Sequence, residues 1–336
     1  MTFGGRPRLR ALVLAAGRGE RLRPLTDRIP KPLLPVAGEP IAGFSLRRLA
    51  AAGCEAAALN LHHLPEQIRT HFGDLYADMP LVYSRETDLQ GTLGALDPLR
   101  SFLAESDVIL LVNGDSLCRW PLGALVRRHR RSGADATLLL HSGLDPERFG
   151  GGVGVDGDGF VRSFRRARAG EGEVARRVFA GAHALSPALL ERVPEGPGDI
   201  ISGLYEPLLA AGGRIASLST SRRWHDLGTP RRYLDGVLDA ISGPFGRRAV
   251  APGALVDPGA RLQGSVVETS AVVERGASVE DSVLLPGASV AAGARLVRVV
   301  LGHGAAVAAG TVLEGVLATR GSAGEAALVL TPLGDR

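Results

Sequence analysis

The sequence predicts an α/β fold: a Rossmann-like, mainly parallel sheet with helices on both faces, followed by a left-handed parallel β-helix. Two observations support this. Between residues 8 and 239, short apolar runs alternate with helix-like stretches, a pattern typical of parallel strands joined by helical crossovers. After residue 243 the composition changes to Val, Ala and Gly, with apolar positions repeating every 17 residues. We expect an α/β domain at 1–243, a β-helix at 249–318, and a tail or cap at 319–336.

The expected elements of the first domain follow from apolar periodicity and turn residues. Proline stands at the first position of two of the helices, where its missing N–H costs no hydrogen bond. An arginine-rich stretch, Arg165–Arg177, has no periodicity, and we expect a mobile surface segment there. The expected strands are Leu9–Ala15, Glu55–Leu61, Val108–Val112 and Ala134–Leu140, and the expected helices are Ala42–Ala52, Pro65–Phe72, Leu122–Arg131 and Pro187–Val193.

The 17-residue repeat gives each side of a triangular coil one inward aliphatic side chain. Glycines such as Gly253 and Gly276 follow three residues later, at corners that require unusual backbone angles. The last coil exposes an edge, which the tail could cap or a second subunit could cover, so we expect a homo-oligomer through the β-helix. The three columns are Val250, Val267, Leu284 and Leu301; Val256, Val273, Val290 and Val307; and Leu262, Val279, Leu296 and Leu313.

The composition excludes several classes of protein. With 45% hydrophobic and 22% charged residues, the chain can bury a full core, which excludes general disorder. The formal net charge is only +4 and the two signs are interspersed, so no nucleic-acid partner is expected. The two cysteines, Cys54 and Cys118, and the absence of a long apolar run favour a cytoplasmic protein with no membrane partner.

A loop of small residues directly follows the first expected strand. Such a loop lets backbone N–H groups approach a phosphate chain, and the nearby Arg21 can neutralise its charge. The loop is not a Walker motif, because it lacks Gly-Lys-Ser/Thr, and it lacks the third glycine of the dinucleotide-binding pattern. The candidate nucleotide-binding residues here are Leu14, Ala15, Ala16, Gly17 and Gly19.

Lys31 is the only lysine among the 39 Lys and Arg residues. Pro30 and Pro32 flank it and stiffen the chain, so its ammonium group can be held in one place as a compact charge on a phosphate. Since the sequence uses arginine at every other cationic position, we expect a specific role for Lys31.

Two aspartates follow apolar segments at positions suited to a metal. Asp115 comes after Asn113 and Gly114, two further candidate nucleotide-binding residues, just past the expected strand at 108–112, where ligands bind in open α/β sheets. Asp226 precedes a Gly-Thr-Pro turn. Carboxylate oxygens suit Mg²⁺, which takes one or two protein carboxylates together with phosphate oxygens and water.

The stretch 14–41, with the segments 112–115 and 224–230, resembles the signature of the sugar-1-phosphate nucleotidyltransferases. The β-helix that follows makes the chain most similar to the mannose-1-phosphate guanylyltransferase-like members. The resemblance implies a Mg²⁺-dependent reaction of an NTP with a sugar 1-phosphate that gives an NDP-sugar and pyrophosphate. It also implies these roles: a triphosphate cradle for Gly17 and Gly19, the leaving pyrophosphate for Arg21, the attacking or α-phosphate for Lys31, and the metal for Asp115 and Asp226.

The segment 86–95 resembles the loop that holds the base in this family, where Gly91 and Gly94 would allow close approach of a flat ring. Glu86 can accept hydrogen bonds from the N–H groups of guanine, which favours GTP, and Thr92 belongs to the same loop. Mannose 1-phosphate is the favoured acceptor on the resemblance alone. Uridylyl or thymidylyl transfer to another sugar 1-phosphate stays open, because Gln90 is also available.

The segments that would bind the sugar phosphate match the family less well than those that would bind the nucleotide. The family commonly has a Glu-Lys pair after the segment that corresponds to residues 161–164, but this chain continues with Arg165 and Arg166. The remaining candidate sugar-binding residues are Gly152, Ala180 and Gly181. The missing pair leaves open a non-catalytic, nucleotide-sugar-binding regulatory subunit. Acyl transfer by the β-helix is a third possibility, for which His303 is the only histidine in the coils.

Overall fold

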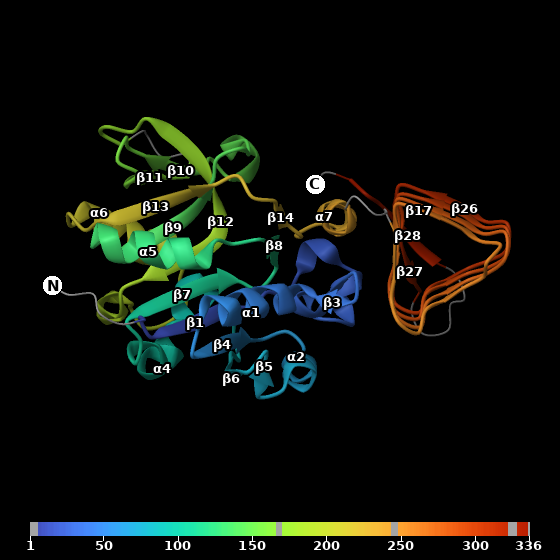
Figure 1. Ribbon diagram of the computed structural model, residues 1–336, viewed down its shortest axis with the longest axis horizontal. Coiled ribbons are helices and arrows are strands. Elements are labelled where there is room, and N and C mark those ends of the chain that lie inside the picture. Colours follow the sequence, from blue (N-terminus) through green and yellow to red (C-terminus); the bar gives the residue numbers. More distant parts are fainter. Residues whose placement is uncertain (1–5, 166–169, 243–247, 322–327, 335–336) are drawn as a thin grey trace. The chain divides into compact units, whose positions relative to one another are not determined.

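The computed structural model describes residues 6–165, 170–242, 248–321 and 328–334 (Figure 1). The chain divides into two compact units. The first comprises the chain up to Gly17 together with Ala42–Trp224, and the second comprises Arg18–Ile41 together with the chain from His225 onward. The domain boundaries expected from the sequence stay predictions.

The first unit is built around a mainly parallel sheet in its central part. The strand order is β11-β10-β12-β7-β1-β4-β6-β5, with β9 beside β12 and β13 beside β9. The neighbours β7-β1-β4-β6 are parallel, whereas β12 runs antiparallel to both β7 and β9. The strands are β1 (Leu9–Leu14), β4 (Ala56–Leu61), β5 (Leu75–Tyr76), β6 (Met79–Arg85), β7 (Val108–Asn113), β8 (Ser116–Cys118), β9 (Ala136–His141), β10 (Val153–Val155), β11 (Val161–Phe164), β12 (Ala175–Leu185) and β13 (Ile215–Thr220).

The helices of this unit connect the strands as the alternating pattern predicts. Each expected strand and helix forms within about two residues of its predicted bounds, and the segment after Pro187 forms as a 3₁₀ helix. The helices are α1 (Ile41–Ala52), α2 (Pro65–Phe72), α3 (Gly91–Gly94), α4 (Arg100–Ala104), α5 (Leu122–Ser132) and α6 (Glu206–Ala210); the 3₁₀ helices are Asp97–Leu99, Pro146–Phe149 and Pro187–Arg192, and a π-helix covers Ile201–Tyr205.

The segment Arg165–Arg177 differs from the prediction at its end. Residues 175–177 belong to strand β12, where Arg177 lies opposite Val153 of β10. A strand forms there, despite the lack of clear periodicity, because its backbone pairs with β10. Residues 166–169 of this segment lie outside the described residues.

The direction of the crossovers reverses beside β1. The chain passes from β1 to β4 and β6 on one side, then returns to β7 on the other side of β1. In open α/β sheets, ligands bind outside the carboxyl ends of the strands at such a reversal. Leu14 and Asn113 end β1 and β7 and are register partners, so this edge is the expected binding crevice of the first unit.

Two histidines are buried in the core of the first unit. The Nδ1 atom of His129 lies 3.1 Å from the Thr137 hydroxyl, and the Nδ1 atom of His183 lies 2.8 Å from the Tyr205 hydroxyl. Burial lowers the pKa of His129 to about 4 and that of His183 to about 3. Both imidazoles are therefore neutral in the folded protein at neutral pH.

These histidines predict a loss of stability in mild acid. As the pH falls below about 6.5, these histidines bind protons in the unfolded chain but stay unprotonated in the folded chain. The free energy of unfolding therefore falls toward pH 4. For His129 the loss reaches about 3 kcal/mol. Denaturant titrations of the protein and of a His129→Gln variant between pH 7 and 4 test this. The free energy of unfolding of the variant should fall less over that pH range. An equal fall in both proteins would contradict the assignment.

The second unit contains a three-sided parallel β-helix, seen in Figure 1 as stacked triangular coils. Val250 pairs with Val267, and Leu284 with Leu301, as the 17-residue repeat predicts. The column residues from Val267 onward form its buried interior. The strands are β15 (Arg248–Val250), β16 (Leu255–Val256), β17 (Arg261–Gln263), β18 (Ser265–Val267), β19 (Val272–Val273), β20 (Ser278–Glu280), β21 (Val283–Leu284), β22 (Ser289–Val290), β23 (Arg295–Val297), β24 (Val300–Leu301), β25 (Ala306–Val307), β26 (Val312–Glu314), β27 (Val316–Arg320) and β28 (Leu328–Pro332).

The remainder of the second unit packs beside these coils. Strand β28 pairs antiparallel with β27 and covers that edge of the last coil. Arg298 of the β-helix contacts Asp235 of helix α7 through a 2.8 Å ion pair. The other elements are the 3₁₀ turns Glu20–Leu22, Leu25–Asp27 and Lys31–Leu33, the hairpin β2 (Pro35–Val36) and β3 (Glu39–Pro40), β14 (Trp224–Asp226) and α7 (Pro230–Ile241).

None of the helices formed by the described residues is long and apolar enough to cross a membrane. Cys54 and Cys118 are buried as free thiols, and burial raises the pKa of each to about 12. Neither thiol is ionised at neutral pH, so both behave as small apolar core residues.

Candidate functional site

The loop after β1 presents small residues at the carboxyl edge of the sheet. Ala15 and Ala16 are buried, and the backbone N–H of Ala15 donates to Asn60 Oδ1 at 2.8 Å. A Cβ atom built on Gly17 would meet nothing within 4 Å, and its φ is not in the left-handed region. Nothing in the protein's own packing therefore requires glycine at position 17, and the open space leaves its backbone accessible to a ligand.

Asn60 links this loop to the candidate base-binding loop. Its Nδ2 donates to Glu86 Oε1 at 2.7 Å, and the backbone N–H of Gln90 donates to Glu86 Oε2 at 3.0 Å. Glu86 is only 6% exposed, so this paired carboxylate fixes the start of the loop. Sequence reasoning did not find Asn60. The available signal was a polar residue near the end of an otherwise apolar strand, beside Leu14.

This network predicts the effect of Asn60→Leu, which keeps the side chain's size and removes both hydrogen bonds. We expect about a tenfold rise in KM for the NTP, because the two loops lose their connection and the Glu86 carboxylate loses a buried donor. Initial-rate kinetics against NTP concentration measure this rise in KM. An unchanged KM would show that the link is not needed for binding.

The glycines of the base loop have a structural cause that differs from the one expected. A Cβ atom on Gly91 would lie 2.4 Å from the carbonyl oxygen of Gly198, and one on Gly94 would lie 2.5 Å from that of Gly196. Thr92 Oγ1 also accepts a hydrogen bond from the backbone N–H of Ile200, at 2.9 Å. These residues pack the loop against the chain at 196–200, so the glycines are not in themselves evidence of a bound base.

Asn113, Gly114 and Asp115 lie at the end of β7, next to the end of β1. The backbone N–H of Gly114 donates to the carbonyl of Leu14 at 2.9 Å, and a Cβ on Gly114 would collide with that oxygen. On the other side of β7, Gly181 faces the Asn113 side chain from an irregular part of β12. Candidate nucleotide-binding and sugar-binding residues therefore meet at this edge, with Asp115 following directly.

Two candidate sugar-binding residues have structural roles. Ala180 is fully buried and its carbonyl accepts a 2.7 Å hydrogen bond from the Trp120 indole. Gly152 has positive φ, and a Cβ there would lie 2.6 Å from the carbonyl oxygen of Arg177. The structure thus places Gly181 beside Asn113, while Gly152 packs on the beginning of β12.

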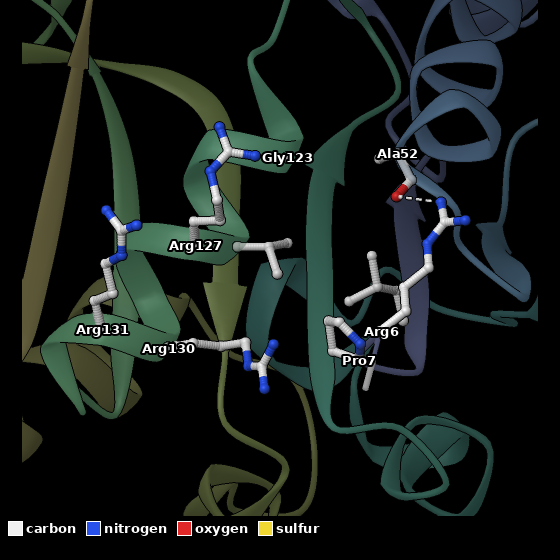
Figure 2. Close-up of a pocket in the computed structure, with 9 residues that line it drawn as sticks. Arg6, Pro7, Ala52, Gly123, Arg127, Arg130 and Arg131 are labelled. Atoms are coloured by element: carbon white, nitrogen blue, oxygen red, sulfur yellow. Dashed lines mark hydrogen bonds between the residues drawn. The ribbon is translucent and has the colours of Figure 1, made fainter. Parts of the chain in front are cut away.

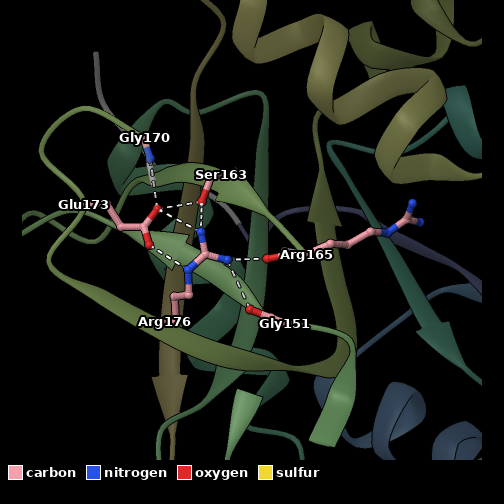
Figure 3. Close-up of polar contacts among 6 residues, drawn as sticks. All are labelled: Gly151, Ser163, Arg165, Gly170, Glu173 and Arg176. Carbon is pink, nitrogen blue, oxygen red and sulfur yellow. Dashed lines mark hydrogen bonds and ion pairs between the residues drawn. The ribbon is translucent and has the colours of Figure 1, made fainter. Parts of the chain in front are cut away.

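A carboxylate does reach the segment where the Glu-Lys pair is missing, but from further along the chain (Figure 3). Glu173 Oε2 accepts a 2.6 Å hydrogen bond from Ser163 Oγ, and Glu173 Oε1 pairs with Arg176 Nε at 2.9 Å. Burial alone would raise the pKa of Glu173, but hydrogen bonds from Ser163 and Gly170 and the charge of Arg176 lower it. The sequence did not predict a carboxylate at this place, because Glu173 lies ten residues after Ser163 rather than directly after the segment 161–164.

Arg165, the residue after β11, is oriented by different contacts. Its guanidinium forms a 2.7 Å ion pair with Asp199, and its backbone N–H donates to the Gly152 carbonyl at 2.7 Å. An arginine at this place can hold a phosphate, but in the structure its charge is paired with the Asp199 carboxylate.

In the second unit, Arg21 and Asp226 meet at Gly228. A Cβ atom on Gly228 would lie 2.6 Å from an Arg21 guanidinium nitrogen and 2.9 Å from Asp226 Oδ1. With glycine at position 228 both side-chain ends approach the turn without displacement, so the Gly-Thr-Pro turn brings together a predicted phosphate-binding cation and a predicted metal ligand.

Lys31 opens a short 3₁₀ turn and is 6% exposed. Gly19 lies beside it at positive φ, where a Cβ would come within 3.3 Å of Lys31 Cβ and 2.8 Å of Thr26 Cγ2. The Thr26 hydroxyl donates to the Gly19 carbonyl at 2.9 Å, which fixes this turn. Gly19 therefore lets the loop pack closely against the base of the lysine side chain.

The metal donors predicted from the sequence are Asp115 and Asp226. Among the described residues, no group of three or more His, Cys, Asp or Glu side chains is arranged to hold a metal ion. Asp226 Oδ2 accepts a 2.7 Å bond from Arg232, and Thr229 rather than Asp226 caps helix α7. Isolated carboxylates fit Mg²⁺, because that ion takes few protein ligands and completes its shell with phosphate oxygens and water.

A separate arginine-lined cavity of about 330 Å³ lies at the opposite end of β1 (Figure 2). It is bounded by Leu9, the first residue of β1, and by Arg127, Arg130 and Arg131 of α5. Cations in the last turn of a helix interact favourably with its carboxyl-terminal dipole, which accounts for two of these arginines. The cavity is not part of the carboxyl-edge site.

Each unit carries some of the groups predicted from the sequence. The first unit has the open backbone at Gly17 and the carboxylates of Glu86 and Asp115, and the second has the cations Arg21 and Lys31 together with Asp226. Cations held by short turns neutralise phosphate charge without reorganising, which is the main protein contribution to phosphoryl and nucleotidyl transfer.

Comparison with known proteins agrees with this chemistry. Residues 10–242 match the nucleotidyl transferase family, and residues 240–318 match the GlmU-like C-terminal hexapeptide family. The chain is 34% identical to a mannose-1-phosphate guanylyltransferase of Mycobacterium tuberculosis, covering 76% of this chain and 74% of the relative. It is 30% identical to a mannose-1-phosphate guanylyltransferase catalytic subunit beta of Drosophila pseudoobscura pseudoobscura, covering 75% and 72%.

A probable mannose-1-phosphate guanylyltransferase 1 of Oryza sativa is also 30% identical, covering 77% of this chain and 71% of the relative. The resemblance to sugar-1-phosphate nucleotidyltransferases that the sequence motifs indicated is confirmed. This chain belongs to the nucleotidyl transferase family, with a hexapeptide β-helix after the transferase region.

Proposed function

We propose that the protein transfers a nucleoside monophosphate from an NTP, with GTP favoured, to a sugar 1-phosphate, with mannose 1-phosphate favoured. The products are an NDP-sugar and pyrophosphate. The observation that carries the proposal is the convergence of Arg21 and Asp226 on Gly228, in a chain whose relatives are named mannose-1-phosphate guanylyltransferases.

In the proposed reaction, a phosphate oxygen of the sugar 1-phosphate attacks the α-phosphorus of the NTP in line, and the bond from that phosphorus to the β-phosphate oxygen breaks. Gly17 and Gly19 would cradle the triphosphate, and Arg21 would neutralise the leaving pyrophosphate. Lys31 would hold the attacking or α-phosphate as a point charge. No covalent enzyme intermediate is required, so catalysis rests on positioning and charge.

Asp115 and Asp226 would hold Mg²⁺, which when bound neutralises phosphate charge and orients the reacting oxygens. Asp226 keeps Oδ1 on the side of Gly228 and Arg21, while Oδ2 is oriented by Arg232. An oriented carboxylate binds an ion with less loss of side-chain freedom.

The preference for GTP rests on Glu86. Each of its carboxylate oxygens accepts one hydrogen bond from the protein, and each has a second lone pair available. Guanine offers two adjacent N–H donors, whereas the mixed edge of uracil or thymine would place a carbonyl oxygen against a carboxylate.

Incubating purified protein with Mg²⁺, each of the four NTPs and a panel of sugar 1-phosphates tests the proposal through pyrophosphate release. We expect the highest rate with GTP and mannose 1-phosphate. A higher rate with UTP or dTTP would reassign the base. No pyrophosphate release with any substrate pair, together with a thermal shift on adding NDP-sugars, would support a regulatory subunit instead.

We also propose that the protein forms a homo-oligomer through its β-helix. Leu255 and Val312 are more than 60% exposed, each on the end strand of a different sheet of the β-helix. Leu255 lies on β16, at one end of β16-β19-β22-β25, and Val312 lies on β26, at one end of β17-β20-β23-β26. Exposed aliphatic side chains on flat parallel strands favour association. Light scattering of the protein and of a Leu255→Glu, Val312→Glu variant tests this.

A further inference from the structure

A buried carboxylate in the β-helix contacts the segment that follows Lys31. Glu268 follows strand β18 and is only 1% exposed. Its Oε1 accepts a 3.1 Å hydrogen bond from the backbone N–H of Gly38, and the backbone N–H of Ala37 also donates to this carboxylate. Glu268 itself is fixed, because its own backbone N–H donates to the Leu284 carbonyl of the next coil at 2.9 Å.

The hairpin that Glu268 contacts has an unusual turn. Ala37 and Gly38 form its two-residue loop, and both have positive φ, 51° and 88°. Two such residues in succession give the tight turn that two-residue hairpins favour, but alanine rarely adopts this conformation. An anion that accepts hydrogen bonds from both N–H groups favours this turn over alternative ones.

The other end of the same hairpin is held by helix α7. Pro35, which opens it, accepts a hydrogen bond from the hydroxyl of the fully buried Tyr233 of helix α7. Burial, reinforced by the negative charge of Glu268, raises the pKa of Tyr233 well above its ordinary value, so the hydroxyl keeps its proton and donates. The hairpin is thus fixed at its base by α7 and at its tip by the β-helix.

The hairpin is joined to Lys31 by a short, stiff connection. The backbone N–H of Leu34 donates to the Lys31 carbonyl at 3.1 Å, and Leu34 is fully buried. Prolines at positions 30, 32 and 35 restrict the backbone angles of this stretch. A shift of the hairpin therefore moves Lys31, since few rotations remain to absorb it.

We propose that Glu268 is a positioning residue for the transfer reaction, through which the β-helix sets the place of the Lys31 ammonium group. This inference rests on the proposed function of Lys31 at a phosphate. It gives the β-helix a part in catalysis within its own chain, in addition to association between chains.

The stability of the β-helix does not explain Glu268. Burial of a carboxylate is costly, and it raises the pKa of Glu268 although the N–H groups of Gly38 and Ala37 oppose this. A buried ionisable group is often replaced by an apolar side chain without loss of stability. What the side chain supplies here, and an apolar residue cannot, is an acceptor for the two N–H groups of the hairpin turn.

The test compares Glu268→Leu, which removes the acceptor, with Glu268→Gln, which keeps one amide oxygen. Glu274→Leu is the matched control, because Glu274 Oε2 also accepts a backbone hydrogen bond, from Ala292 at 2.9 Å, but within the β-helix and at an exposed position. We expect kcat to fall about tenfold or more in Glu268→Leu with a smaller change in KM for the NTP. Glu268→Gln should retain kcat within about threefold, and Glu274→Leu should match the unchanged protein.

Hydrogen exchange of the amides of Ala37 and Gly38 provides a readout that needs no activity. Exchange at both amides should accelerate in Glu268→Leu and stay slow in Glu268→Gln and Glu274→Leu. If the unchanged protein makes no product with any NTP, the proposed function fails, and exchange still decides whether Glu268 holds the hairpin.

Normal exchange in Glu268→Leu, or faster exchange with unchanged kcat, would overturn the proposal. If Glu268→Leu does not fold, Tyr233→Phe keeps the ring and removes only the hydroxyl at Pro35. It should lower kcat in the same direction, and an unchanged kcat would likewise overturn the proposal.

Discussion

Replacing Lys31 by arginine should lower turnover tenfold or more, although the positive charge is kept. Lys31 is almost fully buried in a turn stiffened by three nearby prolines, and Gly19 packs close to its base. The longer, planar guanidinium does not fit the space of a compact ammonium and places its charge elsewhere. Because the displaced group would act in the transition state, the loss should be mainly in kcat.

Pyrophosphate release under saturating substrates measures this effect. The matched control is Arg28→Lys, the reverse exchange at an exposed cation three residues before Lys31. Its turnover should stay close to that of the unchanged protein. Near-normal turnover in Lys31→Arg would remove the lysine from the mechanism, and an equal loss in both variants would indicate a general disturbance of the loop.

The sequence predicts most of the architecture, for reasons that lie in particular residues. Val250 and Val267 pair across neighbouring coils, because a repeat of fixed length can bury its aliphatic side chains only in register. Helix Pro65–Phe72 forms with the predicted bounds, because proline marks its first turn and Gly73 ends it at positive φ.

The candidate site was predictable only in part, because several of its residues act through contacts that are distant in the sequence. Asn60 and Glu86 are separated by 26 residues, and Gly38 and Glu268 by 230. No local pattern marks such a pair. Gly91 shows another case: the motif indicates a glycine for the close approach of a base, and the structure gives this glycine a packing constraint of its own, the carbonyl of Gly198.

Replacing Asp226 by asparagine should lower turnover about a hundredfold and raise the Mg²⁺ concentration needed for half-maximal activity. The amide keeps the shape of the side chain but removes the negative charge that a divalent ion requires. The same change at Asp115 should act in the same direction, since Asp115 lies two residues past the end of β7, at the carboxyl edge of the sheet. Turnover measured across a Mg²⁺ series gives both quantities.

The ion pair of Asp226 with Arg232 offers a second explanation that the experiment must separate from metal binding. If Asp226 acts only by fixing Arg232 to the turn, then Arg232→Gln should reduce turnover as much as Asp226→Asn, and neither should change the Mg²⁺ dependence. If Asp226 holds the ion, Arg232→Gln should cost much less, because the carboxylate keeps its charge and Oδ1 stays beside Gly228. Thr229 rather than Asp226 caps α7, so removing the carboxylate leaves the helix start intact, and a large effect of Asp226→Asn cannot come from a lost cap.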